Sequence, residues 1–211
     1  MIDGGTFDWK ANAKRFPRLT SPDDSHHNVN FVEKYGPNAF IARCGSVPLR
    51  NLGAILAPQT AISIMQGIET LALRMERICF NADLIARFLA QHSRVSWVRY
   101  AGAKDHRDAA LVEKYLAGRG SGVLSFALRG GPAACNVFQN ALTLIRRSVN
   151  LGDCKTLVCH PASTTHRQLR GKNLESLGVT DDLIRISVGV EHIDDLLEDI
   201  DTALWASDSA A

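Results

Sequence analysis

One apolar stripe constrains the fold of this 211-residue chain more than any other feature of its sequence. Its members follow one another at steps of four and three, the spacing that places side chains on one face of an α-helix. The pattern predicts a continuous helix from about Gln59 to Gln91, with Pro58 in its first turn and a length of roughly 50 Å. A helix of that length either links two bodies or lies within one core, and the stripe is compatible with both. The stripe consists of Ile64, Ile68, Leu71, Met75, Ile78, Ala82, Ile85 and Leu89.

The residues after the stripe alternate between strand-like and helix-like patterns. Few strands and several helices predict an α/β chain whose C-terminal part is α+β, with one mostly antiparallel sheet backed by helices. By contrast, residues 1–57 contain turns and a helical pattern broken at Gly45 and Pro48, and no segment among them alternates like a strand. We expect strands at 95–100, 122–129, 156–160 and 183–188, and helices at 132–147, 165–177 and 192–205.

Composition excludes several classes of protein. Lys and Arg total 24 against 22 Asp and Glu, a balance that gives no electrostatic footprint for nucleic acid or an anionic membrane. The chain has no apolar run of about 18 residues, and its first residues lack the basic and apolar regions of a signal peptide. Five scattered cysteines without an export signal predict reduced thiols and a cytoplasmic location.

The segment 148–169 is rich in residues that bind metals or act as nucleophiles. Cys154, Cys159, His160 and His166 could each bind Zn²⁺, but their spacing differs from that of a zinc knuckle, and adjacent residues of a strand point to opposite faces. The second interpretation is a nucleophilic cysteine activated by a histidine. Nothing in the sequence places the thiol of Cys154 or Cys159 at a helix N-terminus or beside a fixed cation. We therefore expect neither a metal site nor a catalytic thiol in this segment.

The predicted strand 183–188 places an arginine between apolar neighbours. Leu183, Arg185 and Ser187 share one face of the strand, and Ile184, Ile186 and Val188 share the other. Burying a guanidinium in mid-strand is costly unless it is paired. Two partners are compatible with the residues: an acid of this chain, which the residues alone favour, or a ligand carboxylate held by the bidentate fork.

Four long motifs follow one another along the chain: "GGTFDW", "AFIARCGSVPLRNLGAILAPQTAISIMQGIETLALRM", "LGDCKTLVCHPASTTHRQL" and "GVTDDLIRISVGVEHIDDLLEDIDTAL". Together they resemble the Cys/Met-metabolism family of pyridoxal-phosphate (PLP) enzymes. This family includes cystathionine synthases and lyases, methionine γ-lyase and O-acetylhomoserine sulfhydrylase, and "NLGDCKTL" and "HPASTTH" are most similar to the sulfhydrylase branch. The resemblance implies the small C-terminal domain of a fold-type-I PLP-dependent transferase. It also implies that Arg185 binds the α-carboxylate of an amino-acid substrate with help from Asn150.

The family's cofactor-binding elements are not recognised in this chain. Family members hold PLP as a Schiff base to a lysine in a Ser-x-Thr-Lys type motif, and none of the seven lysines here has that context. The phosphate-binding turn, the Asp that pairs with the pyridine nitrogen and the stacking aromatic are not recognised either. We therefore expect no catalytic, cofactor-binding or metal-ligating residue. Residues 1–57 would be a remnant of the large PLP-binding domain and residues 58–211 the small domain, entered through the long helix.

The resemblance implies part of an enzyme of sulfur amino-acid metabolism. Its reaction is a γ-replacement in which sulfide or a thiol displaces acetate from O-acetylhomoserine, giving homocysteine or methionine. The expected partners are an O-acetylhomoserine-like amino acid and further copies of the chain, with no nucleic acid and no membrane. The alternative is a non-catalytic truncated remnant or a partner-binding module.

Overall fold

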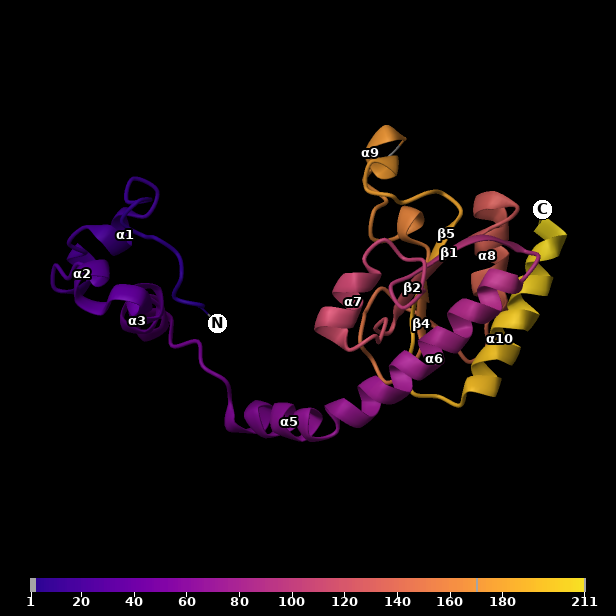
Figure 1. Cartoon of the computed structure of the whole chain (residues 1–211), viewed down its shortest axis with the longest axis horizontal. Helices are drawn as coiled ribbons and strands as arrows, with labels where there is room; N and C mark the ends of the chain where they lie inside the picture. The colour runs from indigo at the N-terminus through magenta and orange to yellow at the C-terminus, as the bar shows by residue number, and fades with distance from the viewer. Residues whose placement is uncertain (1–2, 170, 211) are drawn as a thin grey trace. The chain divides into compact units, whose positions relative to one another are not determined.

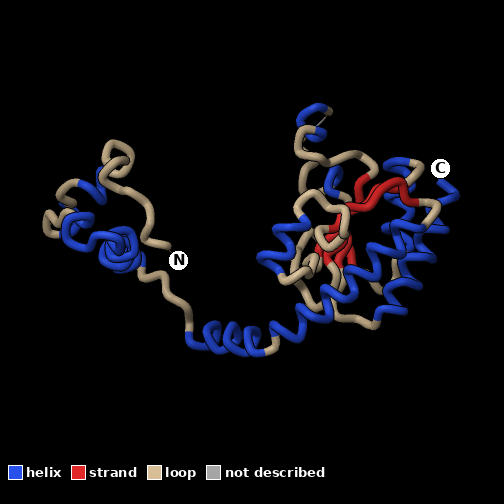
Figure 2. The backbone as a smooth tube through the Cα atoms, viewed as in Figure 1, coloured by secondary structure: helices blue, strands red, loops and turns tan. Residues whose placement is uncertain are grey.

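The computed structural model describes residues 3–169 and 171–210, which form two compact units, Met1–Gln66 and Gly67–Ala211 (Figures 1 and 2). The division falls inside a helix, and the assignment of residues 1–57 to a large cofactor domain stays a prediction. Among the described residues, no helix has both the length and the apolarity needed to cross a membrane.

The first unit consists of short helices around a small aromatic and aliphatic core. The buried members of this core include Leu19, Phe31 and Ala39. The helical pattern expected to break at Gly45 and Pro48 continues through one π turn, Gly45–Leu49. The α-helices are α1 Pro17–Thr20, α2 Phe31–Tyr35, α3 Ala39–Cys44, α4 Arg50–Leu52 and α5 Pro58–Glu69, and 3₁₀ turns span Asp24–His26 and Gly36–Asn38.

A buried carboxylate joins the segments of the first unit. The Asp23 side chain is fully buried, accepts bonds from Ser25 N and Oγ, and lies 2.7 Å from Arg43 Nε. Burial alone would raise the pKa of Asp23, but the Ser25 and Arg43 bonds outweigh it and lower the pKa to about 2. Asp23 therefore stays ionised at neutral pH and connects residues that are distant in sequence.

The predicted long helix is interrupted once. Helix α5 ends at Glu69, α6 spans Leu71–Gln91, and Thr70 between them departs from helical geometry with φ −102° and ψ 3°. The side chain of Arg74 compensates for the break, because its guanidinium donates to the Gly67 carbonyl and to Thr70 Oγ1. The stripe divides accordingly: Ile64, Ile68 and Leu71 are exposed, whereas Ile78, Ala82, Ile85 and Leu89 are buried in the core of the second unit.

The second unit is a five-stranded, mostly antiparallel sheet backed by helices (Figure 1). The sequence predicts four of these strands, whereas the short strand Arg146–Arg147 falls within the helix expected at 132–147. The strand order is β1-β2-β5-β4-β3, and every pairing is antiparallel except the short β3–β4 pair. The elements are β1 Val95–Tyr100, α7 Ala109–Leu116, β2 Val123–Leu128, α8 Gly131–Ala141, β3 Arg146–Arg147, β4 Leu157–Cys159, a 3₁₀ turn Pro161–Ser163, α9 Lys172–Glu175, β5 Leu183–Ser187, α10 Ile193–Ala206 and a 3₁₀ turn Ser207–Ala210.

The central strand β5 divides the two faces of the sheet as predicted. Ile184, Ile186 and Val188 are at most 1% exposed and pack in one core with α6, α8 and α10. Arg185 is half-buried on the opposite face. The core therefore fixes the direction in which Arg185 points.

Two predicted helices are shorter than expected. The helix predicted at 132–147 ends at Ala141, because Leu142 is extended and the Asp199 carboxylate of α10 accepts bonds from Thr143 N and Oγ1, Leu144 N and Ile145 N. These bonds satisfy donors that a continued helix would have used internally. Of the helix predicted at 165–177, only α9 is regular, and residue 170 of that prediction lies outside the described residues.

We predict that Asp199→Asn destabilises the chain at neutral pH by about 1–3 kcal/mol, because an amide offers one acceptor oxygen where the carboxylate offers two. Burial would raise the pKa of Asp199, yet its four hydrogen bonds lower it overall. The stabilisation is therefore complete above the usual carboxyl pKa, about 3.9, and is lost as the pH falls through the lowered folded value. Urea unfolding from pH 7 into the acid range measures this difference.

Glu198→Gln, at an exposed neighbour on α10, is the matched control and should unfold like the wild type. Equal urea midpoints for Asp199→Asn and the wild type at pH 7 would contradict the proposed role of this carboxylate.

Candidate functional site

A row of side chains crosses the open face of the sheet at Arg185. In β5, Arg185 lies opposite Ser125 of β2 on one side and Cys159 of β4 on the other. Ser125 lies in turn opposite Arg99 of β1. Residues directly opposite one another in an antiparallel pair point to the same face. Arg99, Ser125, Arg185 and Cys159 therefore share the face away from the helical core.

Arg185 bonds to a backbone carbonyl. Its Nη2 donates to the carbonyl of Val149 at 2.8 Å. Among the described side chains, no Asp or Glu forms an ion pair with it. Of the two partners compatible with the sequence, an acid of this chain is thus not found among the described residues. Arg185 also forms a side-chain hydrogen bond with Cys159. Arginine has five N–H donors, so further donors remain that could bind an anion.

The backbone on both sides of Asn150 is tied to β5. Val149 accepts the Arg185 bond, and Gly152 N donates to Ser187 Oγ at 3.1 Å. Gly152 has φ +78°, a left-handed conformation that favours glycine. The exposed segment 149–152 is therefore tied at two points to β5. Asn150 lies between those two points.

A second hydrogen-bond network lies at the start of β4. The Glu191 carboxylate accepts bonds from Thr156 N and Oγ1 at 2.6 and 2.8 Å, and Gly189 N donates to Thr156 Oγ1. Asn81 of α6 donates to the carbonyls of Gly189 and Glu191. Sequence reasoning identified none of these residues, because only the fold brings 81, 156 and 189–191 together. They connect the start of β4 to the residues after β5.

His160 and Cys159, in the segment 148–169, have structural partners. The two ring nitrogens of His160 lie 2.9 Å from Ser163 Oγ and 2.7 Å from the Asp181 carbonyl oxygen, so both are engaged. Burial raises the pKa of the Cys159 thiol, and the neighbouring Arg185 only partly offsets this effect. A thiol with a raised pKa is a weak nucleophile at neutral pH. Neither residue is disposed for catalysis in this arrangement.

A hollow of about 290 Å³ lies on the face that carries Arg185. Polar side chains of Arg99, Ser125, His166 and Arg185 line it. Its apolar lining residues are Val123, Leu124, Pro161, Leu177, Val179 and Leu183. A concave site of this kind, mostly apolar with a few convergent polar groups, is typical of small-molecule binding. Arg185 therefore lies where it could contact a bound carboxylate.

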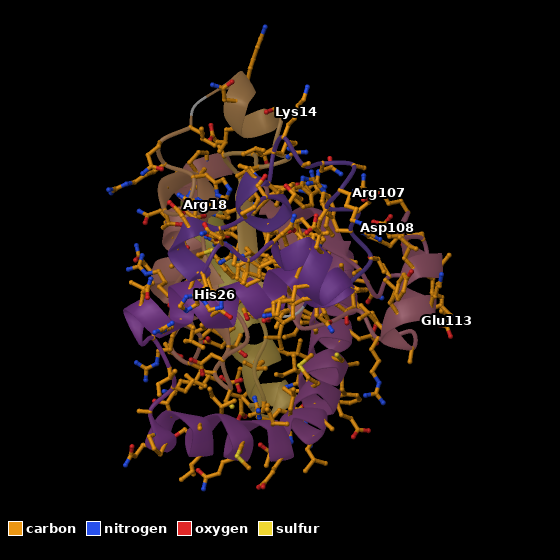
Figure 3. All side chains as sticks on the ribbon, turned by 90° about the vertical axis from the view of Figure 1, so that its left-hand side faces the viewer. Lys14, Arg18, His26, Arg107, Asp108 and Glu113 are labelled. Atoms are coloured by element: carbon orange, nitrogen blue, oxygen red, sulfur yellow. The ribbon has the colours of Figure 1, made fainter. Side chains whose placement is uncertain are left out.

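Another hollow, of about 640 Å³, lies between α6 and the segment 101–120. Figure 3 labels Glu113 of α7, which lines this hollow, and the Arg107–Asp108 ion pair outside its lining, with Nε and Oδ2 3.3 Å apart. The charged groups on its lining balance in sign, and no single ligand chemistry follows from them. They are Glu76, Asp83 and Glu113 with Arg87, Lys104 and Arg119.

Several curated proteins are similar to this chain over most of its length. Homocysteine synthase of Schizosaccharomyces pombe is 44% identical over 97% of this chain, which covers 48% of that protein. O-acetyl-L-homoserine sulfhydrylase of Leptospira meyeri is 41% identical, with the same coverage of 97% and 48%. The chain thus spans about half the length of the curated relatives it matches.

Solved structures of proteins with related names are similar to this chain. A putative O-acetylhomoserine (thiol)-lyase from Campylobacter jejuni, solved with a pyridoxyl-lysine monophosphate group, matches with a TM-score of 0.82 and 37% identity. The match covers 91% of this chain and 45% of that one. O-acetylhomoserine sulfhydrylase of Wolinella succinogenes matches with a TM-score of 0.73 and 32% identity over 96% of this chain and 51% of that one. The fold class expected from the sequence is confirmed.

The family model described as Cys/Met metabolism PLP-dependent enzyme matches residues 6–205. The match extends over nearly the whole chain, and the motifs that suggested this resemblance lie within it or at its edge. The chain therefore belongs to the Cys/Met metabolism family of PLP-dependent enzymes.

Proposed function

We propose that this chain is the C-terminal part of an O-acetylhomoserine sulfhydrylase-type enzyme, in which Arg185 and Asn150 bind the α-carboxylate of the amino-acid substrate. The observation that carries the proposal is the Arg185 guanidinium, which lines a hollow without an acidic partner among the described residues. The names of the relatives supply the reaction, in which sulfide or a thiol replaces acetate to give homocysteine or methionine.

The chemistry of Arg185 suits this task. A planar guanidinium can grip a carboxylate with two parallel N–H···O bonds, which fixes the orientation of the amino acid as well as its position. Orientation matters because the bond to be broken must align with the reacting group. PLP, when bound, supplies the electron sink that makes such replacements possible. In this proposal Arg185 and Asn150 bind and orient, and they transfer no proton.

The residues around Arg185 do not by themselves fit the cofactor. PLP in this family needs a lysine, and none of the seven lysines of the chain lines the hollow. We therefore propose that the lysine and the phosphate site belong to residues outside this sequence or to another polypeptide. The same observation favours the second candidate, a non-catalytic remnant or partner-binding module.

The proposed partners are further copies of the chain, and the proposed compartment is the cytoplasm. Support for the compartment comes from the cysteines, since all five are free thiols. Support for association comes from apolar side chains left exposed on and beside α5. The exposed fractions are 79% for Ile55, 61% for Leu56, 63% for Met65 and 61% for Ile68.

We predict that Arg185→Ala weakens the binding of O-acetylhomoserine by the full chain while the chain stays folded. Each lost charge-assisted hydrogen bond is worth roughly 1.5–3 kcal/mol. Isothermal titration measures the affinity, and circular dichroism reports the fold. Arg146→Ala, an exposed arginine on β3, is the control and should bind like the wild type. A variant that unfolds yet retains affinity in its folded fraction would show that Arg185 is structural.

We predict that PLP labels this chain diffusely. After PLP addition and borohydride reduction, peptide mapping should find substoichiometric modification of several lysines, because an ordinary lysine is mostly protonated at neutral pH. The Campylobacter jejuni protein, solved with a pyridoxyl-lysine group, is the positive control. Stoichiometric labelling of one lysine here, lost on adding O-acetylhomoserine, would refute the prediction.

We predict that the isolated chain self-associates or binds hydrophobic dyes, because exposed apolar patches favour both. Sedimentation velocity over a range of concentrations measures the association. The double variant Ile64→Glu and Ile68→Glu should reduce it, whereas Gln59→Glu and Gln66→Glu on the same helix should not. A compact, dye-silent wild-type monomer would contradict the prediction.

A further inference from the structure

We propose that Thr156 and Glu191 are positioning residues for Asn150. Together they fix where the segment 149–155 lies against β5, and this position decides whether Asn150 reaches the carboxylate that Arg185 binds. The inference rests on the proposed function, because it takes Arg185 and Asn150 as the groups that bind the substrate. It adds two residues that touch no substrate and act through Asn150.

The segment that contains Asn150 runs from β3 to β4 without regular secondary structure. Residues 149–155 are all exposed, so burial of apolar side chains does not fix their position. An exposed connection of this kind moves freely unless its backbone is tied to neighbouring residues. The position of Asn150 therefore depends on the hydrogen bonds that hold the segment.

Four contacts tie this part of the chain to β5 and to the residues that follow β5. They occur in the same order along both stretches of chain, so the segment lies alongside β5 in one fixed register. The contacts join Val149 to Arg185, Gly152 to Ser187, Cys154 to Val190 and Thr156 to Glu191.

The contact at Thr156 consists of two hydrogen bonds and is anchored to the helical core. Thr156 is completely buried, and the Glu191 carboxylate accepts from its backbone N at 2.6 Å and from its Oγ1 at 2.8 Å. Gly189 N donates to the same Oγ1 at 2.8 Å. Asn81 of α6, also completely buried, donates to the carbonyls of Gly189 and Glu191. Hydrogen bonds that involve a charged group are stronger than neutral ones, so this end of the segment is firmly held.

The segment lies so close to the residues after β5 that residue 189 has no room for a side chain. A Cβ placed on Gly189 would lie 2.3 Å from the Cys154 carbonyl oxygen and 2.6 Å from the Lys155 carbonyl carbon. Both are backbone atoms, which cannot turn aside as the end of a flexible side chain can. Glycine at 189 therefore permits the close approach of the segment, and the bonds of Thr156 maintain it.

Removing the Thr156 hydroxyl separates positioning from stability. Thr156→Val loses the bonds to Glu191 Oε2 and Gly189 N, and we expect it to weaken O-acetylhomoserine binding by the full chain about tenfold in isothermal titration, as for one lost charge-assisted hydrogen bond. Thr156→Ser retains the hydroxyl and should bind like the wild type. Glu191→Gln keeps one acceptor oxygen and should have a smaller effect in the same direction.

Tyr100→Phe is the matched control. It also removes a buried hydroxyl, one that bonds to the Cys79 carbonyl of α6, but β1 lies at the opposite edge of the sheet from β3 and β4. This variant should lower stability and leave the affinity unchanged.

A double-mutant cycle tests whether Thr156 acts through Asn150. Asn150→Ala alone should weaken binding by a factor similar to that of Thr156→Val. Adding Thr156→Val to Asn150→Ala should weaken binding little further, because the side chain that Thr156 positions is already absent. Factors that multiply in the double variant would show that Thr156 acts independently of Asn150, and this result overturns the proposal.

Hydrogen exchange of the unliganded chain reports the position of the segment directly. The Gly152 amide, which donates to Ser187 Oγ, should exchange faster in Thr156→Val and in Gly189→Ala, and at the wild-type rate in Tyr100→Phe. Gly189→Ala keeps every side chain of the contact, so its expected loss of affinity does not come from a missing hydroxyl.

The proposal is overturned if folded Thr156→Val and Gly189→Ala both keep the wild-type affinity, or if the exchange of the Gly152 amide is unchanged in both. Wild-type affinity in Arg185→Ala would instead refute the proposed function on which the inference rests, a result distinct from any that the Thr156 and Gly189 variants give.

Discussion

The alternation of side chains along β5 is the constraint on which the rest of the second unit depends. Ile184, Ile186 and Val188 are buried against α6, α8 and α10, so Arg185 must point to the opposite face. A register shift of one residue would place the guanidinium in an apolar core and expose the isoleucines. Burial of those apolar residues therefore stabilises the unit and directs the arginine into the hollow at the same time.

Hydrogen bonds from polar side chains position the loop segments that do not pack in the hydrophobic core. Ser187 and Arg185 hold the segment 149–152, and Glu191 holds Thr156 at the start of β4. The buried Asp199 ends α8 and directs the chain into β3. These contacts join segments that lack regular secondary structure. They also tie the irregular segment that contains Asn150 to β5, the strand that carries Arg185.

The lining of the hollow bears on how this chain relates to the longer enzymes of its family. The relatives are PLP enzymes about twice as long, and the described hollow offers arginines and a serine but no lysine. This lining is consistent with the proposed role of Arg185, in which the cofactor is held by other residues.

The sequence by itself determined the family, most of the strands and helices, and the face on which Arg185 lies. These follow from local patterns, because the periods of strands and helices repeat over neighbouring residues. Only the tertiary structure decided that the long helix breaks at Thr70, that α8 ends at Ala141, and that Arg99 shares a hollow with Arg185. Each of these depends on a specific contact, such as the guanidinium of Arg74 on Gly67, the carboxylate of Asp199 on Thr143, or the pairing of β1 with β2. Contacts of this kind leave no periodic trace in the sequence, because they join a few side chains whose distance is set by the whole fold.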